Sequence, residues 1–178
     1  MNKPHKVFVL FCCIYFLYAG CKKEEEIDKL PPATASGLGT FGCLINGKAW
    51  PVYEKGYHYV QVFYENGSLG VDYTIKPDEL SQFSTAHIGI WVKKIQKPGN
   101  YLVYFDNTNT GSFNAYQNGI YYFSDDPINS GGIGWVNISR LDTAQFGYAA
   151  GTFGFTLFDD AGLSKVKVES GRFDVRLY

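Results

Sequence analysis

The chain has 178 residues, of which 46% are hydrophobic and 19% are charged, and its formal net charge is −1. This balance excludes the concentrated excess of Lys and Arg that phosphate backbones require, so we expect no nucleic-acid partner. Aromatic residues make up 17% of the chain and there are 20 glycines, a composition that favours strands over helices. The length suits one domain with a short appendage.

The start of the chain has the features of a secretory signal. A basic beginning is followed by the apolar, uncharged stretch VFVLFCCIYFLY at residues 7–18. A helix of that length spans about 18 Å, well short of the ~30 Å hydrocarbon core of a bilayer. The small residues Ala19 and Gly20 then precede Cys21. This order predicts a signal peptide over residues 1–20, cleaved between Gly20 and Cys21, with an uncleaved membrane anchor as the alternative.

The next segment changes in composition. Residues 21–39 contain a run of charges, two prolines and small polar residues. Such a segment buries too little apolar surface to fold alone, so we predict a flexible tether and then a single β domain over residues 40–178. Cys43 is the one cysteine in that domain and lies in the apolar context FGCLI. We expect it to be a buried thiol, neither a nucleophile nor part of a disulfide.

Turn signals divide the predicted domain into short apolar segments. Asn-Gly pairs at 46–47 and 66–67 predict tight β-hairpins, because both residues tolerate the positive φ of a type I′ turn, and the pair at 118–119 indicates a further turn. Ser170-Gly171 is expected to be a further turn. A helical turn is expected only at residues 76–83.

Polar and apolar residues alternate with period two in several of these segments. The clearest alternation covers residues 69–76, 86–93, 153–157 and 172–177. It indicates strands with one buried and one wetted face. The sequence therefore predicts an all-β antiparallel fold, a β-sandwich or a calycin-like barrel of about 9–10 strands, following the cleaved signal and the tether.

Three stretches resemble a family of Bacteroidetes lipoproteins that carry a domain of unknown function. They are LPPATASGLGTFGCLINGKAW at residues 30–50, AAGTFGFTLFD at 149–159 and VKVESGRFDVRLY at 166–178. The family pattern is L-P-P-A-T, then F-G-x-x-x-N-G-K-x-W, and finally G-T-F-x-F and G-R-F-D. The resemblance implies a secreted, lipid-anchored β domain, and it supplies no catalytic residues.

The residues around Cys21 resemble two address signals. Those before it are similar to a lipobox, although Tyr18 stands where the motif usually has Leu. This implies that the Cys21 thiol receives lipid, that Cys21 becomes the mature N-terminus, and that the protein is held in the outer membrane. Lys23, Glu24 and Glu25 resemble the surface-export signal of Bacteroidetes lipoproteins. They imply display on the cell exterior, with a periplasm-facing anchor as the alternative.

Other motifs lack the context that their chemistry needs. The run Gly37–Gly42 matches G-x-G-x-x-G, but it follows a Pro-rich segment and enters a predicted hairpin instead of a helix, which argues against nucleotide binding. His58 and His87 have no companions at zinc-ligand spacing. Asp125-Asp126 and Asp159-Asp160 lack the EF-hand loop pattern, so we expect them to cap turns. The sequence predicts no metal and no cofactor.

Nothing in the sequence identifies a catalytic group, and we lean towards a non-enzymatic protein. There is no G-x-S-x-G elbow. A glycan hydrolase of the envelope stays open as an alternative, because its two carboxylates need only be close in space. Asp72, Glu65 and Asp106 lie at or near predicted strand ends, and nothing distinguishes them from solvated edge residues.

The aromatic residues exceed what one face of a sheet can bury. Some of them must therefore face outward or line a concavity, where rings offer a ligand flat apolar area with a polar tip. For each single ring we favour core packing, with ligand binding as the alternative. The candidates are Tyr57, Tyr59, Tyr64, Trp91, Tyr116, Tyr121 and Tyr122. Thr143, in the triplet Asp-Thr-Ala, resembles an O-glycosylation site. The leading hypothesis is a lipid-anchored domain that binds a glycan or a protein partner, and a structural subunit without a small ligand is the third possibility.

Overall fold

The computed structural model describes seven stretches of the chain, and one short 3-10 helix and eleven strands lie in them. The described residues are 25–51, 57–77, 86–104, 111–117, 119–123, 133–159 and 162–177. The elements are η1 (Glu26–Lys29), β1 (Thr40–Ile45), β2 (Lys48–Trp50), β3 (Tyr57–Glu65), β4 (Ser68–Lys76), β5 (Ala86–Val92), β6 (Gly99–Tyr104), β7 (Gly111–Gln117), β8 (Ile120–Phe123), β9 (Ile133–Leu141), β10 (Tyr148–Phe158) and β11 (Lys165–Arg176).

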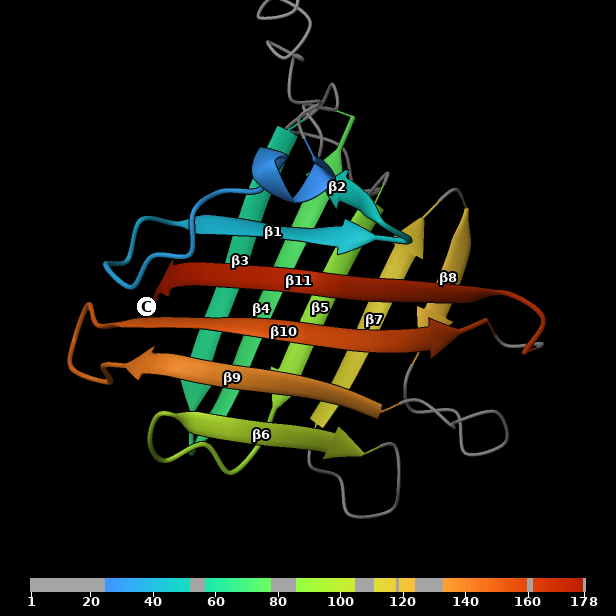
Figure 1. Ribbon diagram of the computed structural model, residues 1–178. Coiled ribbons are helices and arrows are strands. Elements are labelled where there is room, and N and C mark those ends of the chain that lie inside the picture. Colours follow the sequence, from blue (N-terminus) through green and yellow to red (C-terminus); the bar gives the residue numbers. More distant parts are fainter. Residues whose placement is uncertain are drawn as a thin grey trace, which may run out of the picture.

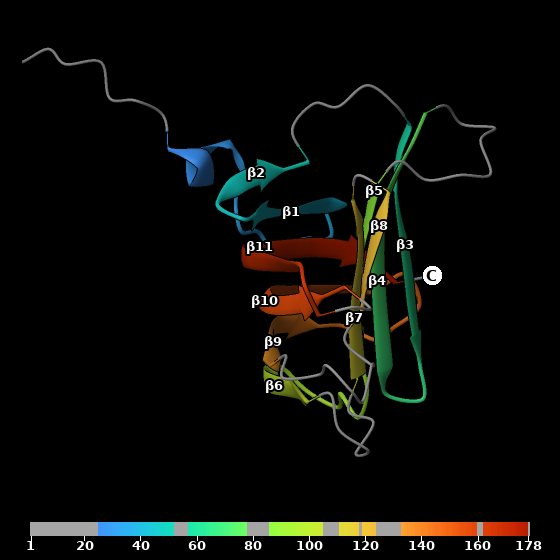
Figure 2. The same cartoon turned by 90° about the vertical axis from the view of Figure 1, so that its right-hand side faces the viewer.

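The strands form two packed antiparallel layers that cross one another (Figures 1 and 2). We call them the six-stranded sheet, in the order β2-β1-β11-β10-β9-β6, and the five-stranded sheet, in the order β8-β7-β5-β4-β3. Among the described residues, one pair, Phe158 with Phe123, joins them through β10 and β8. Because the strand path ends at β2 and β3 without closing, the predicted all-β sandwich is confirmed and the barrel is not formed.

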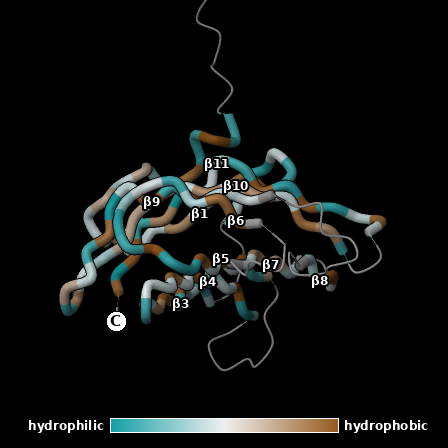
Figure 3. Tube along the Cα trace, turned by 90° about the horizontal axis from the view of Figure 1, so that it is seen from below, coloured by the Kyte–Doolittle hydropathy of each residue, from teal (hydrophilic) through white to brown (hydrophobic). Residues whose placement is uncertain are grey.

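Figure 3 shows the two layers from below. The buried side chains of both layers form one hydrophobic core. The Phe113 ring of β7 stacks on the Phe155 ring of β10 with centroids 4.3 Å apart, and this contact joins the sheets directly. Gly134 of β9 makes room for Phe113, because a Cβ there would lie 2.0 Å from the ring. The side-chain parity expected for β4, β5 and β10 is confirmed, with residues such as Ile88 and Phe153 wholly buried.

Both predicted hairpins, at Asn46-Gly47 and Asn66-Gly67, lie fully within the described residues. Asn46 and Gly47 have φ values of 50° and 80° between β1 and β2, and Asn66 and Gly67 have 50° and 74° between β3 and β4. The prediction of a turn at Ser170-Gly171 is wrong. Ser170 has a φ of 50° within β11, and the pairing with β10 shifts register at this point, so the two residues form a bulge instead of ending the strand.

The predicted tether differs from the structure over residues 25–39, which are most of its length. Residues 25–39 are docked on the domain, because the end of the chain supplies them with hydrogen-bond partners. Asp174 Oδ2 accepts from the Thr34 hydroxyl at 2.7 Å and from the Ser36 amide at 2.9 Å, and its Oδ1 accepts from the Gly37 amide at 2.6 Å. Arg172 Nη1 also donates to the Pro31 carbonyl oxygen at 2.9 Å.

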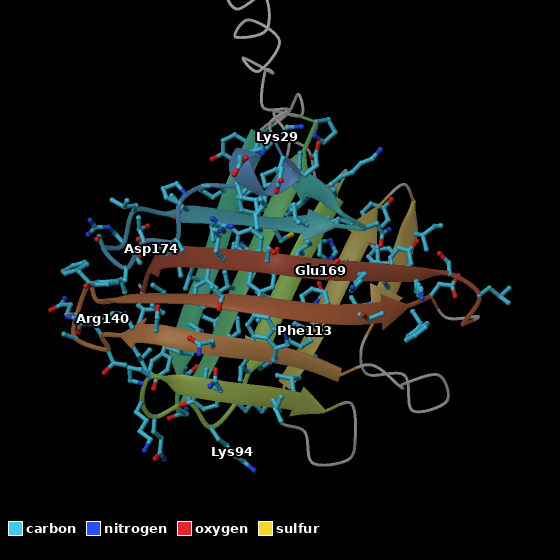
Figure 4. All side chains as sticks on the ribbon, in the orientation of Figure 1. Lys29, Lys94, Phe113, Arg140, Glu169 and Asp174 are labelled. Carbon is cyan, nitrogen blue, oxygen red and sulfur yellow. The ribbon has the colours of Figure 1, made fainter. Side chains whose placement is uncertain are left out.

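We call the contact of residues 34–38 with this carboxylate the Asp174 clasp; Figure 4 labels Asp174. The side chain is buried, which opposes its charged form, but the hydrogen bonds from Ser36, Thr34, Gly37 and Leu38 outweigh that cost and lower the pKa of Asp174. The clasp thus joins the L-P-P-A-T stretch to the G-R-F-D stretch. The helical turn expected at 76–83 lies, from residue 78 onwards, outside the described residues.

Candidate functional site

The outer surface of the five-stranded sheet carries rings and hydrogen-bonding groups in ordered rows. Residues that are opposite one another in an antiparallel ladder point to the same side, so the strand register defines each row. The three rows are Tyr59, Thr74, His87, Tyr116 and Tyr121; then Gln61, Asp72, Gly89 and Asn114; then Phe63, Gly70, Trp91 and Ser112. We call these residues, with Tyr57 and Lys76 at the end of the β3–β4 pair, the aromatic face.

Rings gather at both ends of this face. At one end the Tyr116 and Tyr121 centroids lie 4.4 Å apart, and the His87 ring stacks on Tyr116 at 6.1 Å. At the other end Phe63 and Trp91 meet edge to face at 5.5 Å and remain 45% and 44% exposed. Four residues along a strand separate these rows, a distance of about 13 Å. A molecule that contacts both ends must therefore be extended.

Glycine permits the close packing at the Phe63 end. A Cβ on Gly70 would lie 1.9 Å from the Phe63 ring, so only glycine lets this ring lie flat over β4. Lysines flank the rings: Lys76 Nζ lies 5.1 Å from the centroid of Tyr59, and Lys93 Nζ lies 5.5 Å from that of Trp91. These cation–π contacts help to hold the exposed rings in place.

The centre of the face is polar. Asp72 and Asn114 lean towards each other over Gly89, where a Cβ would lie 2.9 Å from Asp72 Oδ2 and 2.6 Å from Asn114 Oδ1. The Thr74 hydroxyl donates to Asp72 Oδ1 at 2.6 Å, and His87 Nε2 lies 2.8 Å from Asn114 Oδ1. The arrangement holds a carboxylate and an amide in fixed positions between two groups of rings.

The rows contain a single carboxylate, Asp72, among the described residues. Hydrolysis of a glycosidic bond usually needs two carboxyl groups about 5–10 Å apart. Glu65, at the end of β3, points to the same side and lies four residues along the strand from Gln61, the partner of Asp72, a distance of about 13 Å. No group of three or more His, Cys, Asp or Glu side chains that could hold a metal occurs in the described stretches.

The structure divides the seven predicted ring residues between the two faces of the sheet. Five lie on the aromatic face, namely Tyr57, Tyr59, Trp91, Tyr116 and Tyr121. The other two lie on the inner face: the Tyr64 hydroxyl donates to the Ile95 carbonyl oxygen at 2.9 Å, and Tyr122 is 6% exposed. Sequence reasoning missed Phe63 and Asn114, which cross-strand register alone brings to the face.

Several other predicted sites fall outside the described residues. These are Gly20, Cys21, Lys23, Glu24, Asp106, Asp125, Asp126 and Asp160. Glu25 is described and exposed, and its amide donates to Asp28 Oδ2 at 3.2 Å at the start of η1. Thr143 is exposed between β9 and β10. Asp159 Oδ1 accepts from the Leu163 amide at 2.8 Å, which is a turn-capping contact.

The outer surface of the six-stranded sheet differs from the aromatic face. Trp135 of β9 is 42% exposed and lies over Gly154 beside a shallow groove of about 320 Å³. The groove is lined by Lys167 and Glu169, which form an ion pair at 2.8 Å, by the polar Thr156 and Ser170, and by Phe155 and Val168. Leu102 of β6, which is 53% exposed, lies opposite Trp135, so this surface presents an indole and one aliphatic side chain beside charged side chains. Trp135 is a matched control for Trp91, because both are exposed to the same extent on opposite outer faces.

Comparison of the chain with protein-family models, with curated proteins and with solved structures gives no match. In the described part of the chain, no helix has the length and apolar character needed to cross a membrane. Function is therefore inferred from the aromatic face itself.

Proposed function

We propose that this chain is a lipid-anchored domain of the bacterial cell envelope, displayed on the outer membrane surface, that binds an extended glycan on its aromatic face. The observation that carries the proposal is the placement of exposed rings at both ends of a polar centre on one flat sheet. Lipid attachment at Cys21 and surface export through Lys23, Glu24 and Glu25 rest on the sequence motifs.

Sugars match this arrangement chemically. A pyranose ring has an apolar C–H face that packs on an aromatic ring, while its hydroxyl edge donates and accepts hydrogen bonds. On the aromatic face, Trp91 and Tyr121 offer exposed rings, and Asp72, Asn114 and Gln61 lie in the row between them. The separation of about 13 Å between the outer rows exceeds the width of one sugar ring. An oligosaccharide or polysaccharide chain fits better than a monosaccharide.

Two alternatives explain the face less well. A protein-assembly surface has a core that is apolar and depleted of charge, whereas here Asp72, Thr74, His87 and Asn114 separate the exposed rings. A glycan hydrolase would need a second carboxylate close to Asp72, and the described rows supply none. In Figure 3 no described strand lies outside the five-stranded sheet.

The test is binding to an array of immobilised oligo- and polysaccharides. We expect the wild-type protein to bind a restricted set of extended glycans and Trp135→Ala to keep that binding. Trp91→Ala should weaken it at least about tenfold, because one ring contact contributes roughly 1.5 kcal/mol. Equal loss in both variants, or no glycan bound by the wild type, would overturn the proposal.

A further inference from the structure

Residues 25–39 are held on the domain at several points, of which the Asp174 clasp is one. At the start of the segment, Glu26 Oε2 accepts from the Ala49 amide of β2 at 2.9 Å. Further along, Pro31 packs so closely on β1 that a Cβ added to Gly42 would lie 2.7 Å from its Cδ. The folded unit therefore begins at η1, well before the first strand.

This docking shortens the chain that separates the domain from its proposed lipid. Cys21 stands four residues before Glu25, the first described residue. An extended chain spans at most about 3.6 Å per residue, so these four residues reach no further than about 14 Å. A free tether that ran from Cys21 to Thr40 would reach about 68 Å by the same rule. The docked segment thus cuts the reach of the anchor about fivefold.

The docked segment begins on the side of the domain opposite the aromatic face. In Figure 2, η1 lies at the left, beyond the six-stranded sheet, and the five-stranded sheet lies at the right. Packed sheets are about 10 Å apart, and a helical turn with its side chains is about 10 Å across. The aromatic face is therefore about 20 Å or more from Glu25, which exceeds the reach of the four residues.

The aromatic face has a composition that also suits a membrane interface, where Trp and Tyr side chains are enriched. Trp91 is 44% exposed and Tyr121 is 49% exposed. A domain bound to lipid through these rings would have the aromatic face against the bilayer. A domain held by a four-residue anchor that starts beyond the other sheet has this face turned away. The reach of the anchor decides between the two orientations.

We infer that the docked segment seats the domain on the bilayer surface with η1 next to the lipid and the aromatic face turned away from it. The inference rests on the lipid attachment at Cys21 in the proposed function, and it does not depend on which ligand the aromatic face binds. In this orientation the bilayer does not compete with a glycan for the exposed rings.

Quenching of a fluorescent label by nitroxide-labelled phospholipid headgroups tests the orientation. The full chain is expressed in a bacterium that acylates lipoproteins, the acyl mass on Cys21 is checked by mass spectrometry, and the protein is added to preformed phosphatidylcholine vesicles that carry the quencher. A reporter cysteine replaces either Lys48, an exposed residue of β2 beside η1, or Gln61, an exposed residue in the central row of the aromatic face. Cys43 is 0% exposed and stays unlabelled. We expect the label at Lys48→Cys to lose most of its fluorescence and the label at Gln61→Cys to keep almost all of it.

An insertion tests whether the short reach is the cause. A Gly/Ser insertion of about 36 Å extended length, placed after Glu24, lengthens the free chain without touching the docked segment. The quenching at Lys48→Cys should then fall to nearly that at Gln61→Cys. The same insertion after Leu163, which is 89% exposed between β10 and β11, leaves the reach of the anchor as it was and should leave the quenching at Lys48→Cys unchanged.

The possible failures are distinguishable. Equal quenching of the two labels in the acylated protein, or stronger quenching at Gln61→Cys, would overturn the inference while the lipid attachment stands. Unchanged quenching at Lys48→Cys after the insertion at Glu24 would overturn it as well. A chain without an acyl group on Cys21 would overturn the lipid attachment and this inference together, whereas glycan binding is measured separately on the array.

Discussion

Replacing Asp174 by Asn should release the N-terminal segment from the last strand. The two side chains have nearly the same shape, so the change isolates the charge and the accepting capacity of the clasp. If the new NH2 group takes the place of Oδ1, the Gly37 amide loses its acceptor. If it takes the place of Oδ2, the Ser36 amide loses its acceptor, although the Thr34 hydroxyl can reverse its bond.

Either orientation therefore leaves one backbone donor without a partner and weakens the remaining bonds by removing the charge. Hydrogen bonds to charged groups contribute roughly 1.5–3 kcal/mol each. We expect Asp174→Asn to lower the free energy of unfolding by about 3 kcal/mol. With an m value of about 2 kcal/mol/M, this corresponds to a fall of about 1.5 M in the urea midpoint.

Urea unfolding at pH 7, followed by tryptophan fluorescence, measures this change. Asp142→Asn is the matched control, because Asp142 Oδ1 accepts one exposed bond, from the Ala144 amide at 3.1 Å. The control should shift the midpoint by no more than about 0.3 M. Equal shifts in the two variants would refute the clasp as a stabilising contact.

The stability difference between the wild type and Asp174→Asn should also depend on pH. Because the pKa of Asp174 is lowered by folding, its contribution is complete above the unfolded-state pKa of about 3.9 and is lost as the pH falls through the lower folded-state value. The stability difference between wild type and Asp174→Asn should be constant from pH 7 to about pH 5 and shrink below that. A difference that does not change down to pH 2 would contradict the assigned cause.

Three further outcomes follow from the structure and the sequence. Gly134→Ala should destabilise the protein by about 3 kcal/mol, because the new Cβ would lie 2.0 Å from the buried Phe113 ring, and an unchanged urea midpoint would contradict this packing. Cys43 should resist a disulfide reagent at pH 8 until urea unfolds the chain, since burial raises the pKa of its thiol far above the ordinary value; rapid modification of the native protein would be inconsistent with that burial. Cys21→Ser should release the protein from membrane fractions, and full retention would disprove the lipid anchor.

Local signals in the sequence were sufficient to predict most of the fold. Asn46-Gly47 and Asn66-Gly67 allow the positive φ values that their turns adopt. The alternation in β4 and β5 correctly assigns side chains to the inner and outer faces, although Gly70, Thr74 and Gly89 of the outer face are also buried. The Ser170-Gly171 bulge was missed because its composition is also that of a turn. Only the partner strand, which continues on both sides of it, distinguishes the two.

Long-range contacts could not be predicted from the sequence. The segment around Thr34 looks like a linker, and its partner Asp174 lies 140 residues away. The residues of the aromatic face could not be predicted from the sequence either. Parity separates Tyr57 and Tyr59 from Tyr64 on β3, but both sets are aromatic, so the sequence does not say which set is buried. Asn114 and Asp72 come together over Gly89 only through the register of β4, β5 and β7.

Nuclear magnetic resonance mapping of a bound glycan tests the central claim most directly, because it locates the ligand without any substitution. An extended oligosaccharide identified on the array is titrated into the isotope-labelled protein, and backbone amide shifts are followed. The account predicts that the largest changes fall on the rows that contain Asp72, Gly89, Trp91 and Asn114, while the amides around Trp135 stay unchanged. Changes centred on Trp135 and the outer surface of β9–β11 would contradict it.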